Sequence, residues 1–355
     1  MSAVTPAIVL GGTGYVAGEL LRLIAGHPHL ETAAAFSDSQ PGTPLARAFP
    51  QLSSAYPNLA FANLEEIEAL LLRPRAPQIA LFCAAPHGVA AGLIDRLLSS
   101  AEAGGARTHC VDISADFRYS SAAAYEAVYR HPHGAPGRIR EFTCAVPEHL
   151  PRAPTPHVSH PGCFATAVLL ASVPLLALGL SAARFFVTGI TGSTGSGRKP
   201  TEGTHHPLRH ADLYAYGPLA HRHVPEIVRC AKMTTGIDAE FNFVPHSGPF
   251  ARGIHVTVQA ELKKPLTGAQ AIDAFASFYK DSPFVRVVDS PPRVKDVATS
   301  NYANLTAATN GGTVAVMAVL DNLNKGAAGG AMQWMNRLLG LEESAGLTAC
   351  APGWT

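Results

Sequence analysis

The first 25 residues most restrict the fold, because a short apolar run, a glycine-rich turn and an amphipathic stretch follow one another directly. Residues 7–10 (AIVL) are typical of a strand buried on both faces of a parallel sheet. Gly11-Gly12-Thr13-Gly14 comes next, and residues 15–25 repeat apolar side chains at helical spacing. Further strand-like runs at 32–36, 78–83 and 109–113, with a helix-like stretch at 88–98, predict a parallel α/β sheet.

The glycine turn predicts a dinucleotide site. Backbone N–H groups at a helix N-terminus bind phosphates, and glycine lets the phosphates come close. The run from Gly12 to Ala17 fits G-x-G-x-x-A between a strand and a helix, the context that the motif requires. A glycine turn kept for packing is the alternative. The predicted cofactor contacts are Gly11, Gly12, Thr13, Gly14, Tyr15 and Val16.

The end of the predicted second strand bears on the choice between NADP and NAD. An acidic residue there would bind the ribose 2′-hydroxyl of NAD. This chain has Ser37-Asp38-Ser39. The hydroxyls of Ser37 and Ser39 can donate to the 2′-phosphate of NADP, whereas Asp38 would repel that phosphate if it pointed inward. The pattern favours NADP, with NAD as the alternative.

Cys163 is the predicted nucleophile. Pro161-Gly162 forms a turn before a long apolar run, so Cys163 begins a predicted helix, where the helix dipole favours thiolate. A thiolate can attack an acyl carbon. A buried structural cysteine is the alternative. Residues 158–183 contain no Asp, Glu, Lys or Arg, but proline and glycine interrupt them, so we expect a buried core helix rather than a membrane span.

Two clusters of histidines offer proton carriers for such a nucleophile. They occupy residues 205–210 and 221–223, among 16 histidines in all. Adjacent histidines do not easily face one metal ion, and the chain has no C-x-x-C pair, so we predict no metal site.

A glycine- and serine-rich loop between these motifs suits an anion. Residues 193–199 (STGSGRK) combine small residues, which expose backbone N–H groups, with two cations. The anion could be the phosphate of an acyl phosphate or the diphosphate of the cofactor, and a flexible connection is the alternative. We assign Ser193 and Gly195 to the cofactor, and Arg198 and Lys199 to the substrate.

Composition narrows the class of protein. Lys+Arg is 27 and Asp+Glu is 26, so a net charge of +1 gives no general attraction to nucleic acid or to an anionic membrane. Six cysteines without a C-x-x-C pair fit reduced thiols, and the first charged residue is Glu19, unlike the basic start of a signal peptide. We expect a cytoplasmic protein without nucleic-acid or membrane partners.

The second half of the chain differs in pattern. Residues 185–191, 254–262 and 313–320 are β-rich, and long loops separate them. They predict an α+β domain with a more antiparallel sheet, followed by a helix at 327–339.

Six segments in order resemble the N-acetyl-γ-glutamyl-phosphate reductases of arginine biosynthesis. The segments are residues 11–20 with the glycine turn, 85–88 (APHG), 112–118 (DISADFR), 161–166 (PGCFAT), 221–227 (HRHVPEI) and 321–326 (DNLNKG). The resemblance covers nearly the whole chain. It implies an α/β Rossmann-type nucleotide-binding domain and a second α+β catalytic domain, as in semialdehyde dehydrogenases.

The resemblance also implies roles and boundaries. It gives residues 1–160 plus 325–355 to the nucleotide domain and 161–324 to the catalytic and dimerisation domain, in a homodimer or homotetramer. It implies Cys163 as nucleophile and His221 as general acid/base, with His223 as the less favoured residue of the pair. We assign His223 to substrate binding. By the same resemblance, Pro86 and Asn322 contact the cofactor. Arg118 is a candidate for the substrate carboxylate or phosphate by its chemistry.

Two departures keep alternatives open. Cys144-Ala145-Val146 precedes Pro147-Glu148 where the family often has tyrosine-glycine-leucine, so the acyl group could be N-acetyl, N-succinyl or carrier-linked. Residues 199–210 are similar to a sister group that reduces aminoadipyl or glutamyl phosphates held on a small acidic carrier protein. A dinucleotide-binding sensor without turnover is the alternative from another class.

Overall fold

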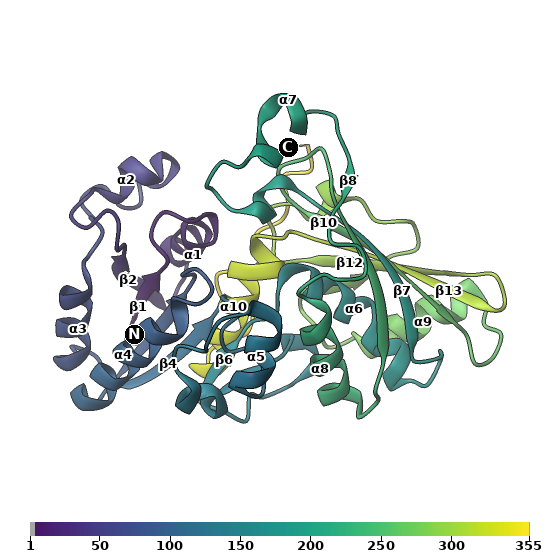
Figure 1. Ribbon diagram of the computed structural model, residues 1–355, viewed down its shortest axis with the longest axis horizontal. Coiled ribbons are helices and arrows are strands. Elements are labelled where there is room, and N and C mark those ends of the chain that lie inside the picture. The colour runs from purple at the N-terminus through teal and green to yellow at the C-terminus, as the bar shows by residue number, and fades with distance from the viewer. Residues whose placement is uncertain (1–3, 355) are drawn as a thin grey trace. The chain divides into compact units, whose positions relative to one another are not determined.

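The computed structural model describes residues 4–354, and the chain forms two compact units (Figure 1). The first unit holds residues 4–144, 152–160 and 331–347, and the second holds 145–151, 161–330 and 348–354. The short segments 145–151 and 348–354 therefore pack with the second unit.

A six-stranded parallel sheet forms the centre of the first unit, in the order β2-β1-β3-β4-β6-β5. Its strands are β1 (Thr5–Leu10), β2 (Leu30–Phe36), β3 (Gln78–Cys83), β4 (Arg107–Asp112), β5 (Phe142–Cys144) and β6 (His157–Ser159). The apolar run at 7–10 is buried throughout, as expected for a central strand between two others. The predicted parallel α/β sheet is confirmed.

Within residues 4–354, six helices belong wholly or mainly to this unit: α1 (Tyr15–Ala25), α2 (Leu45–Ala48), α3 (Leu64–Leu72), α4 (Ala90–Gly104), α5 (Ala122–Tyr129) and α10 (Gly329–Leu338). Local sequence explains their ends. Asn63 and Glu66 form a capping box at the start of α3, and Gly105 adopts φ 82° after α4. Two 3₁₀ turns, η1 (Pro50–Leu52) and η2 (Pro136–Glu141), complete the unit.

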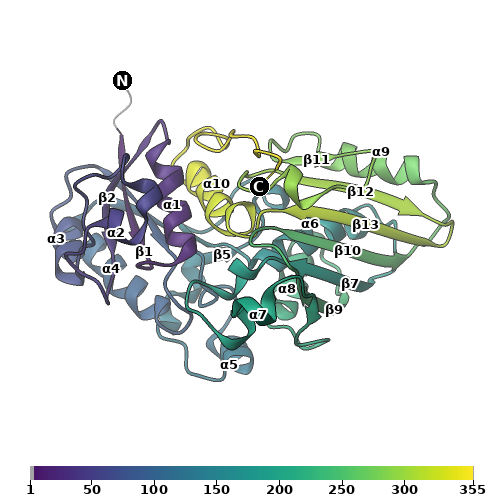
Figure 2. The ribbon, with the colours of Figure 1, turned by 90° about the horizontal axis from the view of Figure 1, so that it is seen from above.

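The last helix, α10, packs with the first unit although it lies near the end of the sequence. Figure 2 shows α10 beside α1, and the His27 ring at the end of α1 bonds the Asn336 side chain at 3.0 Å. Trp334 on α10 is fully buried. Burial lowers the pKa of His27, which favours the neutral ring at this contact.

The second unit is built on a seven-stranded mixed sheet in the order β11-β12-β13-β10-β7-β9-β8, with four antiparallel and two parallel neighbours. Its strands are β7 (Arg184–Thr191), β8 (Tyr214–Ala215), β9 (Glu240–Ser247), β10 (Ile254–Glu261), β11 (Val285–Val287), β12 (Ala303–Thr309) and β13 (Thr313–Leu320). The predicted α+β domain is confirmed.

Helices α6 (Cys163–Ala177), α8 (Val224–Thr235) and α9 (Gly268–Phe278) pack on this sheet. Residues 164–176 of α6 are all buried, because the helix contacts strands and other helices around its circumference. Pro174 lies inside it and cannot bond the Leu170 carbonyl, and the Tyr279 hydroxyl donates to that carbonyl at 2.7 Å instead. In residues 4–354 no helix is both long and apolar enough to span a bilayer.

Short turns connect these elements: η3 (Pro147–His149), η4 (Ser193–Ser196), η5 (Glu202–Thr204), α7 (His206–Arg209), η6 (Val294–Asp296) and the π-helical turn η7 (Asn324–Ala328). The single helix predicted over 327–339 is thus a π-helical turn followed by α10. The Gly326 N–H bonds the Asp321 carbonyl at 2.9 Å, and the Ala328 N–H bonds the Leu323 carbonyl at 3.0 Å, which are the wider five-residue steps of a π-helix.

Candidate active site

Cys163 is the first residue of α6, and the turn before it is held by a buried carboxylate. The Gly162 N–H donates to Glu226 Oε1 at 2.9 Å, and Glu226 is fully buried at the start of α8. A Cβ on Gly162 would lie 2.4 Å from Cε1 of His223 and 2.5 Å from its Nε2. Only glycine fits this position, so the residue before the nucleophile is packed directly against the second histidine of H-R-H.

Cys163 is partly exposed and lines a cavity of about 550 Å³. Its lining residues are Cys163, Phe164, Thr191, Gly195, Ser196, Tyr214, Tyr216, Gly217, Ala220, His221, Arg222, His223 and Ser247. The size is typical of sites for small molecules. The structure therefore brings together the predicted nucleophile, both histidines of H-R-H and Gly195 of the anion loop.

His221 is neutral at physiological pH. Burial and the neighbouring Arg222 charge lower its pKa to about 4. Its Nδ1 accepts the backbone N–H of His223 at 3.2 Å, so a proton on Nδ1 would face another N–H group. The neutral ring therefore carries its proton on Nε2, where it can donate a hydrogen bond.

Tyr216 is a phenol beside the nucleophile. Burial and the negative charge of a Cys163 thiolate both raise its pKa, so its hydroxyl stays protonated. Its ring centroid lies 5.7 Å from that of His221. The cavity thus combines one thiol with two neutral side chains that can donate hydrogen bonds.

The π-helical turn η7 contacts the nucleophile from another direction. A Cβ on Gly326 would lie 2.7 Å from the Cβ of Cys163. This close approach explains the glycine in D-N-L-N-K-G. It also ties the position of the Cys163 backbone to the loop that begins at Asp321.

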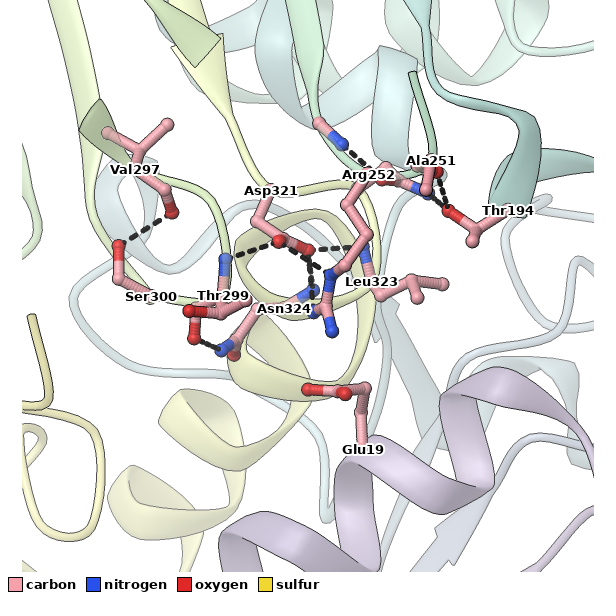
Figure 3. A network of polar contacts seen from close by, with 12 residues as sticks. Glu19, Thr194, Ala251, Arg252, Val297, Thr299, Ser300, Asp321, Leu323 and Asn324 are labelled. Atoms are coloured by element: carbon pink, nitrogen blue, oxygen red, sulfur yellow. Dashed lines mark hydrogen bonds and ion pairs between the residues drawn. The ribbon is translucent and has the colours of Figure 1, made fainter. Parts of the chain in front are cut away.

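Asp321 organises that loop (Figure 3). The Nε and Nη2 atoms of Arg252 donate to its two oxygens at 2.9 and 3.0 Å. Backbone N–H groups of Thr299, Leu323 and Asn324 donate to the same carboxylate at 2.5, 2.8 and 2.9 Å. Five donors on one fully buried carboxylate make a rigid centre.

Asn322, predicted to contact the cofactor, joins two parts of the second unit. Its Oδ1 accepts the Gly253 N–H at 2.7 Å, and its Nδ2 donates to Thr194 Oγ1 at 3.0 Å. The side chain is 2% exposed. It therefore holds the anion loop in place, next to the predicted Ser193 and Gly195. Arg198 and Lys199 are exposed farther along the loop, and neither is among the residues that line the cavity.

The glycine turn in the first unit has the geometry that a dinucleotide needs. Gly11 has φ 132°, and a Cβ there would lie 2.6 Å from the Ala84 carbonyl oxygen. Gly12 has φ 56°, and its Cβ would lie 3.1 Å from Ser37 Oγ. Gly14 precedes α1 without any side-chain cap, and the first turn holds no acidic residue. The turn fits an anionic diphosphate at the helix N-terminus.

The other predicted residues of the first unit have these positions. Thr13 and Val16 are half-buried, while Tyr15, Ser39 and Pro86 are exposed. Arg118 is 4% exposed, and it donates from Nε to the His160 carbonyl at 3.0 Å and from Nη2 to the Ile113 carbonyl at 2.9 Å. Its guanidinium thus holds the backbone just before Pro161.

Sequence reasoning missed three residues of the site: Tyr216, Arg222 and Glu226. Arg222 is part of H-R-H-V-P-E-I, but the motif predicts no role for it; in the structure it lines the cavity and lowers the pKa of His221. Glu226 lies in the first turn of a helix, three positions after His223. An acidic residue at such a place was the local pattern that could have indicated its role. Nothing local marks Tyr216.

Known proteins are similar to this chain over nearly its whole length. Residues 6–149 match the family described as semialdehyde dehydrogenase, NAD binding domain, and residues 163–322 match semialdehyde dehydrogenase, dimerisation domain. An N-acetyl-gamma-glutamyl-phosphate reductase of Pseudomonas putida (strain W619) is 36% identical over an alignment of 351 residues that covers 96% of this chain and 97% of that protein. One of Methanopyrus kandleri is also 36% identical, over 96% of each chain.

The chain belongs to the N-acetyl-γ-glutamyl-phosphate reductase family. Its fold is also that of aspartate semialdehyde dehydrogenase II from Vibrio cholerae, with a TM-score of 0.69 at 14% identity, covering 95% of this chain and 99% of the other. The resemblance seen in the six sequence segments is thereby confirmed.

Proposed function

We propose that this protein catalyses the NADPH-dependent reduction of N-acetyl-γ-glutamyl phosphate to N-acetylglutamate 5-semialdehyde and phosphate, a step of arginine biosynthesis. The observation that carries the proposal is the cavity in which Cys163, at the start of α6, lies with His221. The family membership supplies the substrate.

Cys163 performs the covalent step. Its thiolate, stabilised by the N-terminus of α6, attacks the acyl carbon, and the bond from that carbon to the phosphate oxygen breaks. The product is a thioester on Sγ and free phosphate. The nicotinamide, when bound, supplies the hydride for this thioester. The carbon–sulfur bond then breaks, which releases the aldehyde and returns the thiolate.

His221 acts on the oxygen of the reacting carbonyl. Its neutral ring presents the Nε2 proton as a donor, which stabilises negative charge on that oxygen while the thiohemiacetal exists. His221, expected as the general acid/base, thus acts as a hydrogen-bond donor that keeps its proton on Nε2. His223 packs against Gly162 and supports the turn before Cys163.

The glycine turn from Gly11 to Val16 would hold the cofactor diphosphate, and Ser37 and Ser39 would receive the ribose 2′-phosphate. Ser37 is 2% exposed, and its Oγ lies beside Gly12. These residues support NADP ahead of NAD. All six cysteines are free thiols, which supports a cytoplasmic location.

A phosphate-dependent assay of the reverse reaction tests the function. The protein is given N-acetylglutamate semialdehyde, phosphate, and NADP⁺ or NAD⁺ in parallel, and absorbance of the reduced nicotinamide is followed. We expect the absorbance to rise only when phosphate is present, and to rise faster with NADP⁺ than with NAD⁺. If a folded protein that binds NADPH gives no rise in absorbance with either cofactor, N-acetylglutamate semialdehyde is not its substrate. The next assay would then use an aminoadipyl derivative on its carrier protein.

Replacing His221 with alanine is expected to lower kcat about 10²-fold or more, since a positioned donor at the reacting oxygen is lost. His221→Gln keeps an N–H donor and should retain part of the rate. Because the pKa of His221 is about 4, its protonation affects the pH profile only as the pH approaches 4. An inflection of kcat/KM near pH 6.5 that disappears in His221→Gln would contradict this assignment.

The open face of the mixed sheet is proposed as the contact in a homodimer. Along β7 the inward side chains are buried, whereas Phe186 on the other face is 58% exposed. The match to a dimerisation domain covers this sheet. A second copy would cover the apolar ring, and two such dimers could form the tetramer.

Phe186→Glu is expected to shift the protein toward monomer, because a charge would be buried in the contact. Sedimentation velocity measures the mass directly. Leu178→Glu, at a site after α6 that is 46% exposed, is the control and should leave the mass unchanged. A Phe186→Glu protein with the wild-type mass would place the contact elsewhere.

A further inference from the structure

The second unit contains another cavity, of about 270 Å³, that shares no lining residue with the Cys163 cavity. Its lining residues are Ser193, Thr204, His206, Arg209, His210, Ala211, Pro249, Phe250 and Ala251. Five of these side chains can donate hydrogen bonds, and none is acidic. A cavity lined by donors without a carboxylate favours an anion.

Arg209 is the charged residue of this cavity. It lies at the end of α7 and is 8% exposed, and its Nη1 donates to the Asp212 carbonyl at 3.0 Å. Its Nε and Nη2 atoms are buried, and in the described part of the chain they meet no hydrogen-bond acceptor. Burying N–H groups of a cation without acceptors costs free energy, so a ligand that supplies acceptors is favoured.

Arg252 shows what the Nε and Nη2 edge of a guanidinium binds in this protein. In Arg252 the same two atoms, Nε and Nη2, hold both oxygens of Asp321 at 2.9 and 3.0 Å. Arg209 presents the same pair of donors, which matches the spacing of two oxygens in a carboxylate or phosphate.

The other donors favour a tetrahedral anion over a planar one. The ring centroids of His206, the first residue of α7, and His210, directly after it, lie 5.2 Å apart, and both side chains are exposed. Ser193 adds a hydroxyl from η4, whereas the Thr204 hydroxyl at the edge of the cavity already donates to the Thr201 carbonyl at 3.0 Å. Donors that come from several directions can reach three oxygens of a phosphate, whereas a carboxylate offers two in one plane.

We propose that this cavity is a phosphate-binding site, separate from the catalytic cavity, in which Arg209 holds two oxygens and His206 and His210 approach the others. The guanidinium edge is covered by protein in this conformation. Binding therefore includes a rotation of Arg209 or a small movement of residues 202–210. The site does not depend on the identity of the acyl substrate.

Imidazole resonances test the site directly, because they report on it and not on the catalytic cavity. Signals of His206 and His210 are assigned with His206→Gln and His210→Gln, and inorganic phosphate is titrated into the full-length protein. We expect both signals to shift with a single dissociation constant. Phenyl phosphate in a second arm distinguishes a phosphomonoester from free phosphate, and acetate in a third reports on carboxylates.

Arg209→Gln should weaken this phosphate binding about tenfold or more, as expected for loss of charged hydrogen bonds. Arg75→Gln removes an exposed arginine of the first unit and is the matched control, with binding unchanged. A circular dichroism spectrum and melting curve like those of the wild type establish that Arg209→Gln is folded. If Arg209→Gln does not fold, Arg209→Lys is used in its place, because lysine keeps the charge without the paired donors.

Two results would overturn the proposal. One is that phosphate moves the signals of His221 or His223 while those of His206 and His210 stay fixed. The other is that acetate binds as tightly as phosphate, which would assign the cavity to carboxylates.

Discussion

Replacing Cys163 with serine is expected to reduce turnover on the order of 10³-fold or more, the largest effect on activity of any single change considered. The reaction begins with a thiolate, and the α6 N-terminus stabilises that charge. A serine hydroxyl at the same place stays protonated at neutral pH and does not form the acyl intermediate at a useful rate. The phosphate-dependent assay measures the loss.

The control for this experiment separates chemistry from binding and folding. Cys163→Ser should bind NADPH with the affinity of the wild type, since the glycine turn belongs to the first unit. Cys350→Ser changes the exposed cysteine near the chain end and should retain full activity. A Cys163→Ser protein that turns over at close to the wild-type rate would remove Cys163 from the mechanism.

Replacing Lys325 with methionine is expected to lower the free energy of unfolding by about 3–5 kcal/mol, the typical cost of breaking a buried ion pair. Lys325 Nζ lies 2.5 Å from Glu148 Oε1, and the two side chains are 0% and 1% exposed. Without Lys325 the Glu148 carboxylate stays buried and loses the cation that lies against it. Urea unfolding followed by circular dichroism measures the change.

A double replacement makes this prediction specific to the ion pair. Lys325→Met combined with Glu148→Leu removes both charges and leaves apolar groups, so it should cost clearly less than the single change. A single Lys325→Met change of under about 1 kcal/mol would show that the pair contributes little. Lys325 precedes Gly326, which contacts Cys163, so the single variant should also lose activity.

Local patterns predicted the elements that depend on neighbouring residues. The helix expected over residues 15–25 begins and ends there, and the strands expected at 78–83 and 313–320 have the same bounds in the structure. Cys163 begins α6, because the backbone of Gly162 before it is extended, with ψ 157°. These results need only side-chain periodicity and the conformational preferences of glycine and proline.

The sequence by itself therefore determined the two kinds of domain, the glycine turn and the start of the helix at Cys163. Tertiary structure alone decided which carboxylate holds Gly162 and which acid neutralises Lys325. Glu226 is 64 residues from Gly162, and Glu148 is 177 residues from Lys325. Local preferences contain no information about such pairs, since partners are chosen only when the mixed sheet and its helices bring distant segments into one buried space.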